Sequence, residues 1–312
     1  MNPYSGVSFF SFFPVMMKRI FLFFSGDVGS LASDEVQLLV LICIALSSAL
    51  LGTFLVLRKM TMLANSLSHT ILIGIVGAFF LSRFIFNRDE GIYTIHFPTL
   101  LIGAVITALL TTISTEFFHK KLRLQKDASI GLIFTSFFAL GVIFVTVLSR
   151  NSHLGVEAIM GNVDALHPNH IKQVFYLLLV NAIFVFLFFR RLEVISFDQD
   201  LAKNFGISLL FFNHLLMFQT ALTAVGSFRA VGVFLFLAFL VAPALTARFF
   251  THRLKPLLFL AGGIGTFAAL ISVALSRHFL SVYHLPLATS GLAAVILGAL
   301  FLGGALHKLR KG

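Results

Sequence analysis

The sequence predicts an all-α protein, a polytopic bundle of about nine helices that cross a membrane. Its 312 residues are 58% hydrophobic and only 11% charged, whereas a soluble domain carries about 25% charged residues. The mean hydropathy is +1.00. The apolar residues gather in runs of about 20, the length that spans a hydrocarbon core about 30 Å thick. Because a water-soluble fold of this length cannot bury so much apolar surface, we expect the runs to lie in a membrane.

The breaks between apolar runs define nine segments long enough to span. They are Val36–Leu57, Met60–Phe84, Phe97–Thr115, Ser129–Ser149, Lys172–Phe189, Ser208–Gly226, Ala230–Phe250, Leu257–Ser276 and Leu287–Leu306. We expect Pro243 to kink or end the seventh, since proline removes a backbone donor and clashes with the preceding turn. Residues 1–35 are expected to form an N-terminal extension, either an interfacial helix or a tenth span. Residues 36–306 then form the transmembrane domain and 307–312 a cytoplasmic tail.

The connections between these segments alternate in charge. One set holds most of the basic residues: Arg58, Lys59, Lys120, Lys121, Arg123, Lys126, Arg190, Arg191, Lys203, Arg248, Arg253, Lys255, Lys308, Arg310 and Lys311. Cytoplasmic loops are enriched in Lys and Arg, so this set predicts the cytoplasmic side and places the start of the first span outside. The same pattern accounts for the net charge of +11 without nucleic-acid binding.

The second predicted span carries a polar stripe. Asn65 and His69 are four residues apart and therefore share one helix face. His69 lies roughly 13 Å from the cytoplasmic end at 1.5 Å per residue, close to the middle of the core. Polar groups are costly there unless they line a cavity or meet another helix. Two interpretations are open: the pair contacts a transported metal ion, or it bonds neighbouring helices.

A polar loop between the fifth and sixth spans predicts a short surface helix. Asp198 or Asp200 can cap its first turn, Ala202 allows close approach, and Gly206 ends it. Such a helix is suited to insertion into a partner's groove, and an ordinary surface helix is the alternative. No G-x-x-x-x-G-K-[ST] loop is present in the sequence, so this chain does not bind ATP by that route.

Four blocks occur in order along residues 36–306. They are Gly52–Met60 with Ser68–Gly74, Asp127–Gly131 with Ala139–Gly141, Asp200–Ala202 with Gly206, and Val231–Val233 with Leu240–Arg248. Together they resemble the membrane permease of zinc-, manganese- and iron-type ABC importers. The resemblance implies a bacterial inner-membrane permease that pairs with a second, identical or related permease. It also implies two cytoplasmic ATP-binding subunits and an external metal-binding protein as partners.

The resemblance also assigns roles to individual residues. It places Asp200, Ala202 and Gly206 in the helix that fits the ATPase groove. It places Asn65 and His69 where the family commonly has an Asp and a His as pathway ligands. Position 65 departs from that pattern, and a neutral carbonyl attracts a divalent cation less than a carboxylate does. A partner permease would then supply the missing carboxylate.

These expectations make the chain a transport subunit rather than an enzyme, with no cofactor of its own. We expect it to pass Mn²⁺, Zn²⁺ or Fe²⁺ into the cytoplasm, driven by ATP hydrolysis on separate subunits. The alternative is a secondary, ion-coupled metal transporter. Transporters of that class commonly carry acidic or basic residues within their spans, and no predicted span here has an interior Asp or Glu.

Overall fold

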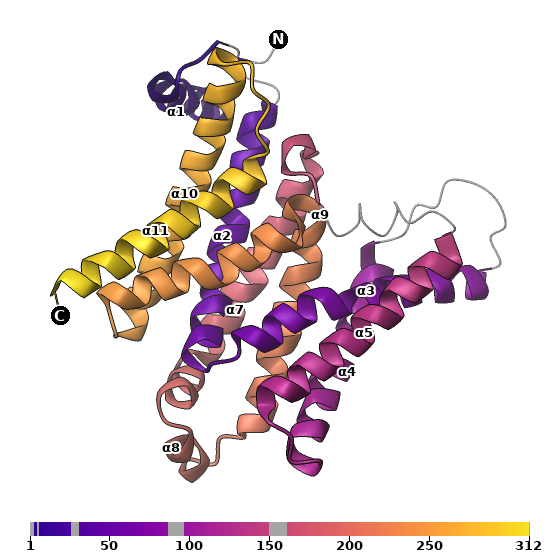
Figure 1. Cartoon of the computed structure of the whole chain (residues 1–312). Helices are drawn as coiled ribbons and strands as arrows, with labels where there is room; N and C mark the ends of the chain where they lie inside the picture. Colours follow the sequence, from indigo (N-terminus) through magenta and orange to yellow (C-terminus); the bar gives the residue numbers. More distant parts are fainter. Residues whose placement is uncertain (1–2, 5, 26–30, 87–96, 150–160, 312) are drawn as a thin grey trace. The chain divides into compact units, whose positions relative to one another are not determined.

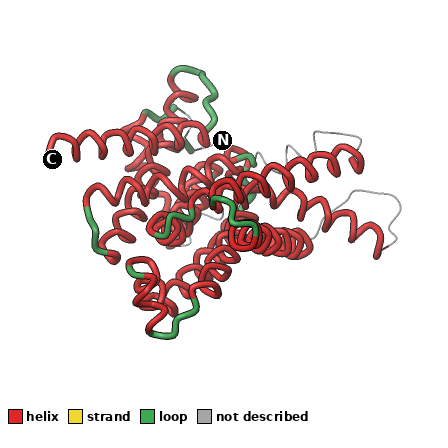
Figure 2. Tube along the Cα trace, turned by 60° about the horizontal axis from the view of Figure 1, so that its bottom comes forward, coloured by secondary structure: helices red, strands yellow, loops and turns green. Residues whose placement is uncertain are grey.

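The computed structural model describes residues 3–4, 6–25, 31–86, 97–149 and 161–311, and helices joined by short loops account for most of them (Figures 1 and 2). The elements are α1 (Phe9–Ser25), α2 (Ser33–Leu57), α3 (Thr61–Phe86), α4 (Phe97–Lys121), α5 (Lys126–Ser149), the 3₁₀ turn η1 (Val163–Ala165), α7 (Asn169–Phe197), α8 (Gln199–Asn204), α9 (Leu209–Phe250), α10 (Leu254–Val282) and α11 (Thr289–Lys311). The described residues contain no strand. The predicted all-α fold is confirmed.

Nine segments of the described chain are long and apolar enough to cross a membrane, as the sequence predicts. Helices α2, α3, α4, α5, α7, α10 and α11 supply one each. Helix α9 supplies two, Leu209–Phe228 and Ala230–Phe250. Its 42 residues would extend roughly 63 Å at 1.5 Å per residue, about twice the thickness of a bilayer core. Two spans therefore meet within α9.

The backbone of α9 leaves the helical region at Gly232, with φ 78° and ψ 168°. A side chain at this φ would be strained, so glycine suits the junction. The helix does not end at Pro243 but continues to Phe250, and its backbone leaves the helical region at Gly232 instead. A Cβ built on Gly265 of α10 would lie 3.7 Å from the Pro243 ring. Helix α10 therefore packs against the ring at this point, and packed neighbours let membrane helices accommodate proline.

The chain forms two compact units, which we describe separately. The first comprises Met1–Thr53, Gly161–Phe184 and Ala230–Gly312. Its interior brings α2 against α9, where a Cβ on Gly52 would lie 1.8 Å from the carbonyl oxygen of Leu240. Asn181 of α7 donates a hydrogen bond from Nδ2 to Ser47 Oγ in the same interior. Backbone contact at a glycine, with polar bonding between helices, is typical of membrane helix packing.

The second unit comprises Phe54–Met160 and Val185–Arg229. Within it α3 packs against both α4 and α5. Gly74 and Gly103 bring the backbones of α3 and α4 together, because a Cβ on Gly74 would lie 2.3 Å from the Gly103 carbonyl oxygen. Thr111 of α4 donates a hydrogen bond to Thr70 of α3, with Oγ1 to Oγ1 3.0 Å. These contacts fix the face of α3 that is turned away from Asn65.

Candidate functional site

The predicted polar stripe lies on the first turns of α3. Asn65 is exposed from the chain, and His69, one turn later, is half-buried. The His69 imidazole packs against two stacked phenylalanine rings of α5, with centroid distances of 5.3 Å to Phe134 and 5.7 Å to Phe138. The two predicted residues therefore share one face, as their spacing requires, and one of them is walled by aromatic rings.

The metal-binding capacity of this stripe is limited in the described chain. No group of three or more His, Cys, Asp or Glu side chains comes together among the residues that the structure describes. Asn65 and His69 offer one amide oxygen and an imidazole nitrogen, and a Zn²⁺ or Mn²⁺ ion takes at least four ligands. The pair alone therefore supplies too few ligands to hold a divalent ion. It can serve a passing cation if further ligands come from water or another chain.

The short helix predicted in the basic loop is present as α8. Asp198 caps it, since its Oδ1 accepts hydrogen bonds from the backbone N–H groups of Asp200 at 3.0 Å and Leu201 at 2.9 Å. Gly206 ends it in the left-handed region with φ 71°, and its N–H donates to the Lys203 carbonyl. These are the N-cap and glycine C-cap devices that the sequence indicated.

The outward face of α8 carries charge and apolar surface. The Lys203 ammonium lies 2.8 Å from Asp200 Oδ1 and holds the pKa of that carboxyl below its ordinary value. Both side chains are exposed, so solvent screening keeps the pair weak. Leu201 and Phe205 are also exposed, while Ala202 is fully buried within the chain. The face that another protein can reach therefore contains Asp200, Leu201 and Phe205, and Ala202 anchors the helix from behind.

A buried arginine stands at the end of α2, a feature that sequence reasoning placed only among the loop charges. Arg58 is 6% exposed, and its Nη2 donates to Oδ1 of Asn213 on α9. Burial lowers the pKa of Arg58 to about 10. Its Nε and Nη1 have no hydrogen-bond partner among the described residues. Asn213 thus links α9 to the end of α2 by a hydrogen bond, a common role for a polar residue in a span.

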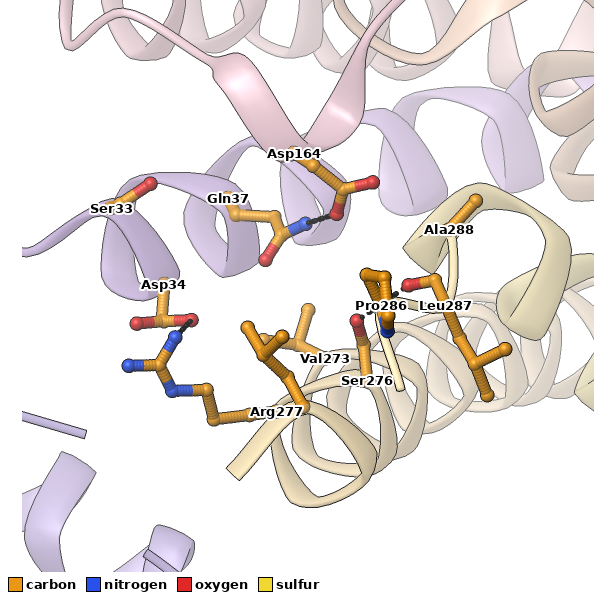
Figure 3. Close-up of a pocket in the computed structure, with 11 residues that line it drawn as sticks. Ser33, Asp34, Gln37, Asp164, Val273, Ser276, Arg277, Pro286, Leu287 and Ala288 are labelled. Atoms are coloured by element: carbon orange, nitrogen blue, oxygen red, sulfur yellow. Dashed lines mark hydrogen bonds and ion pairs between the residues drawn. The ribbon is translucent and has the colours of Figure 1, made fainter. Parts of the chain in front are cut away.

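A polar cavity of about 370 Å³ lies in the first unit (Figure 3). Asp164 of η1 accepts hydrogen bonds from Gln37 Nε2 at 2.8 Å and from Thr289 Oγ1 at 2.6 Å. Arg277 of α10 faces Asp34 of α2, with Nη1 to Oδ1 3.8 Å. The bonded partners are separated by 125 residues or more in the Asp164 cluster, so no local pattern could predict this cavity.

Comparison with known proteins decides the family. Residues 35–308 match the model of the ABC 3 transport family, a range that includes the polar stripe, α8 and all nine candidate spans except two residues at the start of the first and two at the end of the last. The chain belongs to this family. The resemblance predicted from the four sequence blocks is confirmed, and the protein is a multi-pass membrane permease of the ABC transporter type.

Individual relatives agree with the family match over most of their length. A "probable metal transport system membrane protein" of Chlamydia muridarum is 38% identical over 304 residues, which cover 97% of this chain and 93% of the relative. The manganese transport system membrane protein MntD of Bacillus subtilis is 34% identical, with 87% and 90% covered. The solved structure of PsaBC from Streptococcus pneumoniae in complex with Fab matches with a TM-score of 0.70 and 27% identity, covering 86% of this chain and 89% of that one.

Proposed function

We propose that this ABC 3 permease moves a divalent transition metal ion, Mn²⁺, Zn²⁺ or Fe²⁺, from an external binding protein into the cytoplasm of a bacterial cell. The observation that carries the proposal is the family match over residues 35–308. The names of the chlamydial and Bacillus relatives, which specify metal and manganese transport, support the substrate class.

His69 is the residue of this chain best suited to contact the metal. Its imidazole is a common ligand for Zn²⁺, Mn²⁺ and Fe²⁺, and a half-buried position leaves it accessible. The rings of Phe134 and Phe138 beside it restrict its rotation and offer no competing donor. Asn65 adds a neutral oxygen one turn away, which makes it a weak or indirect ligand. A second permease, identical or related, supplies the remaining ligands, including any carboxylate.

A site with few charges suits a transport path. An ion must bind strongly enough to leave water and weakly enough to move on. An imidazole and an amide oxygen replace water as ligands, which lowers the barrier for the ion to enter. Because they carry no formal negative charge at neutral pH, they do not hold the ion as tightly as a structural site does. Released metal would then pass toward the basic, cytoplasmic ends of the helices.

Helix α8 is the contact proposed for a separate ATP-binding subunit. It lies in the basic loop that the charge distribution assigns to the cytoplasm, and Asp200, Leu201 and Phe205 face outward from it. The capped ends keep six residues helical without support from a longer helix. A rigid, compact element of this kind can transmit movement between subunits, whereas a flexible loop would absorb it.

The test is transport by the reconstituted complex. The permease would be purified with its ATP-binding subunits, placed in liposomes, and supplied with radiolabelled manganese, zinc or iron on its metal-binding protein. We expect uptake that requires ATP on the cytoplasmic side and stops when the ATPase subunit is inactivated. Uptake that follows an imposed proton or sodium gradient, without ATP, would instead identify a secondary transporter and overturn the proposal.

A further inference from the structure

The N-terminal helix α1 lies outside the residues that match the family model, which begin at residue 35. It is nevertheless docked on the first unit. Tyr4, Phe12 and Met16 are buried, and α1 packs against α10. Figure 1 shows α1 beside the end of α10, across the axis of that helix. One face of α1 is therefore packed against the rest of the first unit.

Polar contacts pin this segment to the first turn of α2. The Glu35 carboxylate, 3% exposed, accepts a hydrogen bond at Oε1 from the Tyr4 hydroxyl at 2.8 Å and pairs with Arg19 Nε at 2.5 Å. Arg277 of α10 donates from Nε to the Tyr4 carbonyl at 3.0 Å. Charge-assisted bonds between largely buried groups are stronger and more specific than surface pairs. They fix the depth of α1 relative to α2.

The position of α1 beside the first turn of α2 excludes a transmembrane course for α1. Glu35 is in the first turn of a span, so it lies at a membrane surface, which the distribution of basic residues predicts to be the outer one. Arg19 lies past the middle of α1 and touches Glu35. A spanning α1 that ends at this surface would place Arg19 about 9 Å below it and Tyr4, before the first turn, near the opposite side. Both residues instead contact Glu35. With 17 residues and an interior Pro14, α1 is also only about 25 Å long.

The remaining face of α1 is apolar and uncovered. Phe10, Met17 and Phe21 are 82%, 68% and 75% exposed, and their spacing of seven and four residues places them on one stripe. Exposed Lys18 stands beside the stripe. Large aromatic and aliphatic side chains with an adjacent cation are the pattern of a helix that lies in the interface of a membrane.

We propose that α1 is an interfacial helix that lies in the plane of the outer leaflet, with Phe10, Met17 and Phe21 in the boundary between headgroups and acyl chains. Lys18 then reaches the lipid phosphates. The occupant of the stripe is lipid, because Glu35 holds α1 at the level where a span enters the headgroup region. This assignment chooses between the two courses that the sequence left open for residues 1–35.

The position of α1 gives it a mechanical role at the outer end of the first unit. Arg277 and Asp34, which line the polar cavity, belong to the same network that holds Tyr4. A helix anchored in the interface and bonded to both α2 and α10 holds the outer ends of those two helices together. The anchored α1 thereby helps to keep the walls of the cavity, which α2 and α10 contribute, in place.

The experiment measures depth and sidedness in proteoliposomes. With Cys43→Ala as background, Phe10→Cys, Met17→Cys and Phe21→Cys would each carry a fluorophore, quenched by lipids spin-labelled near the headgroup or near the acyl-chain end. We expect all three positions to be quenched more by the headgroup-proximal label, to similar extents. Ser8→Cys and Ser25→Cys should label from one side, the side of Leu285→Cys and opposite to Lys203→Cys.

Two outcomes would overturn the proposal. Labelling of positions 8 and 25 from opposite sides, with strongest quenching of position 17 by the deep spin label, would make α1 a tenth span. Absence of quenching by either lipid at all three positions would mean that protein covers the stripe. Phe10, Met17, Phe21 and Ser25 are exposed and Ser8 is only partly buried, so the variants should fold, and their yield relative to Cys43→Ala checks this directly.

Discussion

The imidazole of His69 on α3 lies against the phenyl ring of Phe134 on α5, with the ring centroids 5.3 Å apart. Phe138, which stacks on Phe134, touches the same imidazole with the ring centroids 5.7 Å apart. Aromatic rings supply packing but do not satisfy two ring nitrogens, so the imidazole retains its capacity to bind a ligand. A histidine held by apolar walls in a span, with an accessible edge, is suited to contact a passing cation.

We therefore predict that His69→Ala lowers metal uptake per assembled complex by about tenfold or more, since even changes in the outer shell of metal sites cost roughly 10–100-fold. Membrane abundance and binding of the ATP-binding subunit should stay near the level of the unchanged protein. Radiolabelled uptake, divided by the amount of complex, measures this. Met62→Ala, which alters an exposed side chain of the same helix, is the control. Unchanged uptake per complex in His69→Ala would remove His69 from the path.

Asn65→Asp should be tolerated and should strengthen metal retention. Asn65 is exposed from the chain on the face of His69, and on the proposed path, which water and the cation reach, a carboxylate of the same shape avoids the cost of a charge facing lipid. At about 4 Å, each added unit charge contributes roughly 1–4 kcal/mol of attraction per cation charge at effective dielectric constants of 80 to 20. Titration of the detergent-solubilised complex with Mn²⁺ should show tighter binding. Asn65→Leu, of similar size but without the oxygen, should show weaker binding, and identical affinities in all three proteins would argue against any contact.

Helix α8 should be required for association with the ATP-binding subunit. Asp200→Lys reverses an exposed charge and is the decisive variant. Gly206→Trp places a large side chain in open space, since no atom of the chain lies within 4 Å of a built Cβ, but its φ of 71° also strains the end of α8. We expect about a tenfold loss of co-purified ATPase subunit from each variant, with helical content and yield of the permease preserved. Lys126→Glu, which reverses a charge in another basic loop, is the control. Full recovery of the complex with both α8 variants would show that the contact lies elsewhere.

Local sequence signals predicted those parts of the structure that depend on neighbouring residues. The nine spans follow from apolar runs of bilayer length. Helix α8 follows from Asp198 at one end and Gly206 at the other, because a cap is a contact between residues two to four apart. The shared face of Asn65 and His69 follows from helix geometry. Their roles in transport stay predictions, since spacing places side chains and does not identify a ligand.

Features that depend on distant contacts could not be predicted from the sequence. The break in α9 is at Gly232, while the helix continues through Pro243, whose ring packs near Gly265 of α10. Arg58 was assigned to a loop by its charge, yet the fold buries it against Asn213, 155 residues away. The polar cavity likewise joins Gln37 to Asp164. Each depends on which helices become neighbours, and apolar composition alone carries little information about that.

Gly52 should be irreplaceable for the packing of the first unit. A Cβ at Gly52 would lie 1.8 Å from the Leu240 carbonyl oxygen and 2.8 Å from its carbon, so Gly52→Ala forces backbone atoms of α2 and α9 apart. Overpacking typically costs 1–3 kcal/mol, and backbone rather than a movable side chain must shift here. We expect lower yield and a lower Tm. Gly263→Ala is the matched control, because no atom lies within 4 Å of its built Cβ, and equal losses from both substitutions would count against the close approach.

The pair of Arg58 and Asn213 should contribute strongly to stability, because the guanidinium is buried and Asn213 is its one hydrogen-bond acceptor among the described residues. Asn213→Leu keeps the approximate volume and leaves the cation without that acceptor, which costs about 1.5–3 kcal/mol for a bond to a charged group. Asn213→Asp supplies a carboxylate to the same nitrogen and should raise stability instead.

Thermal unfolding in detergent measures both changes, and Arg58→Met with Asn213→Leu completes a double-mutant cycle. A loss of 1 kcal/mol corresponds to roughly 2–4 °C in Tm for a chain of 150–250 residues and to less for a longer one, so Asn213→Leu should lower the Tm by about 3 °C or more. The double variant should recover part of that loss, since the unpaired charge is then absent. Strictly additive effects of the two single substitutions, or a lower Tm for Asn213→Asp than for Asn213→Leu, would show that the two side chains do not act as a pair.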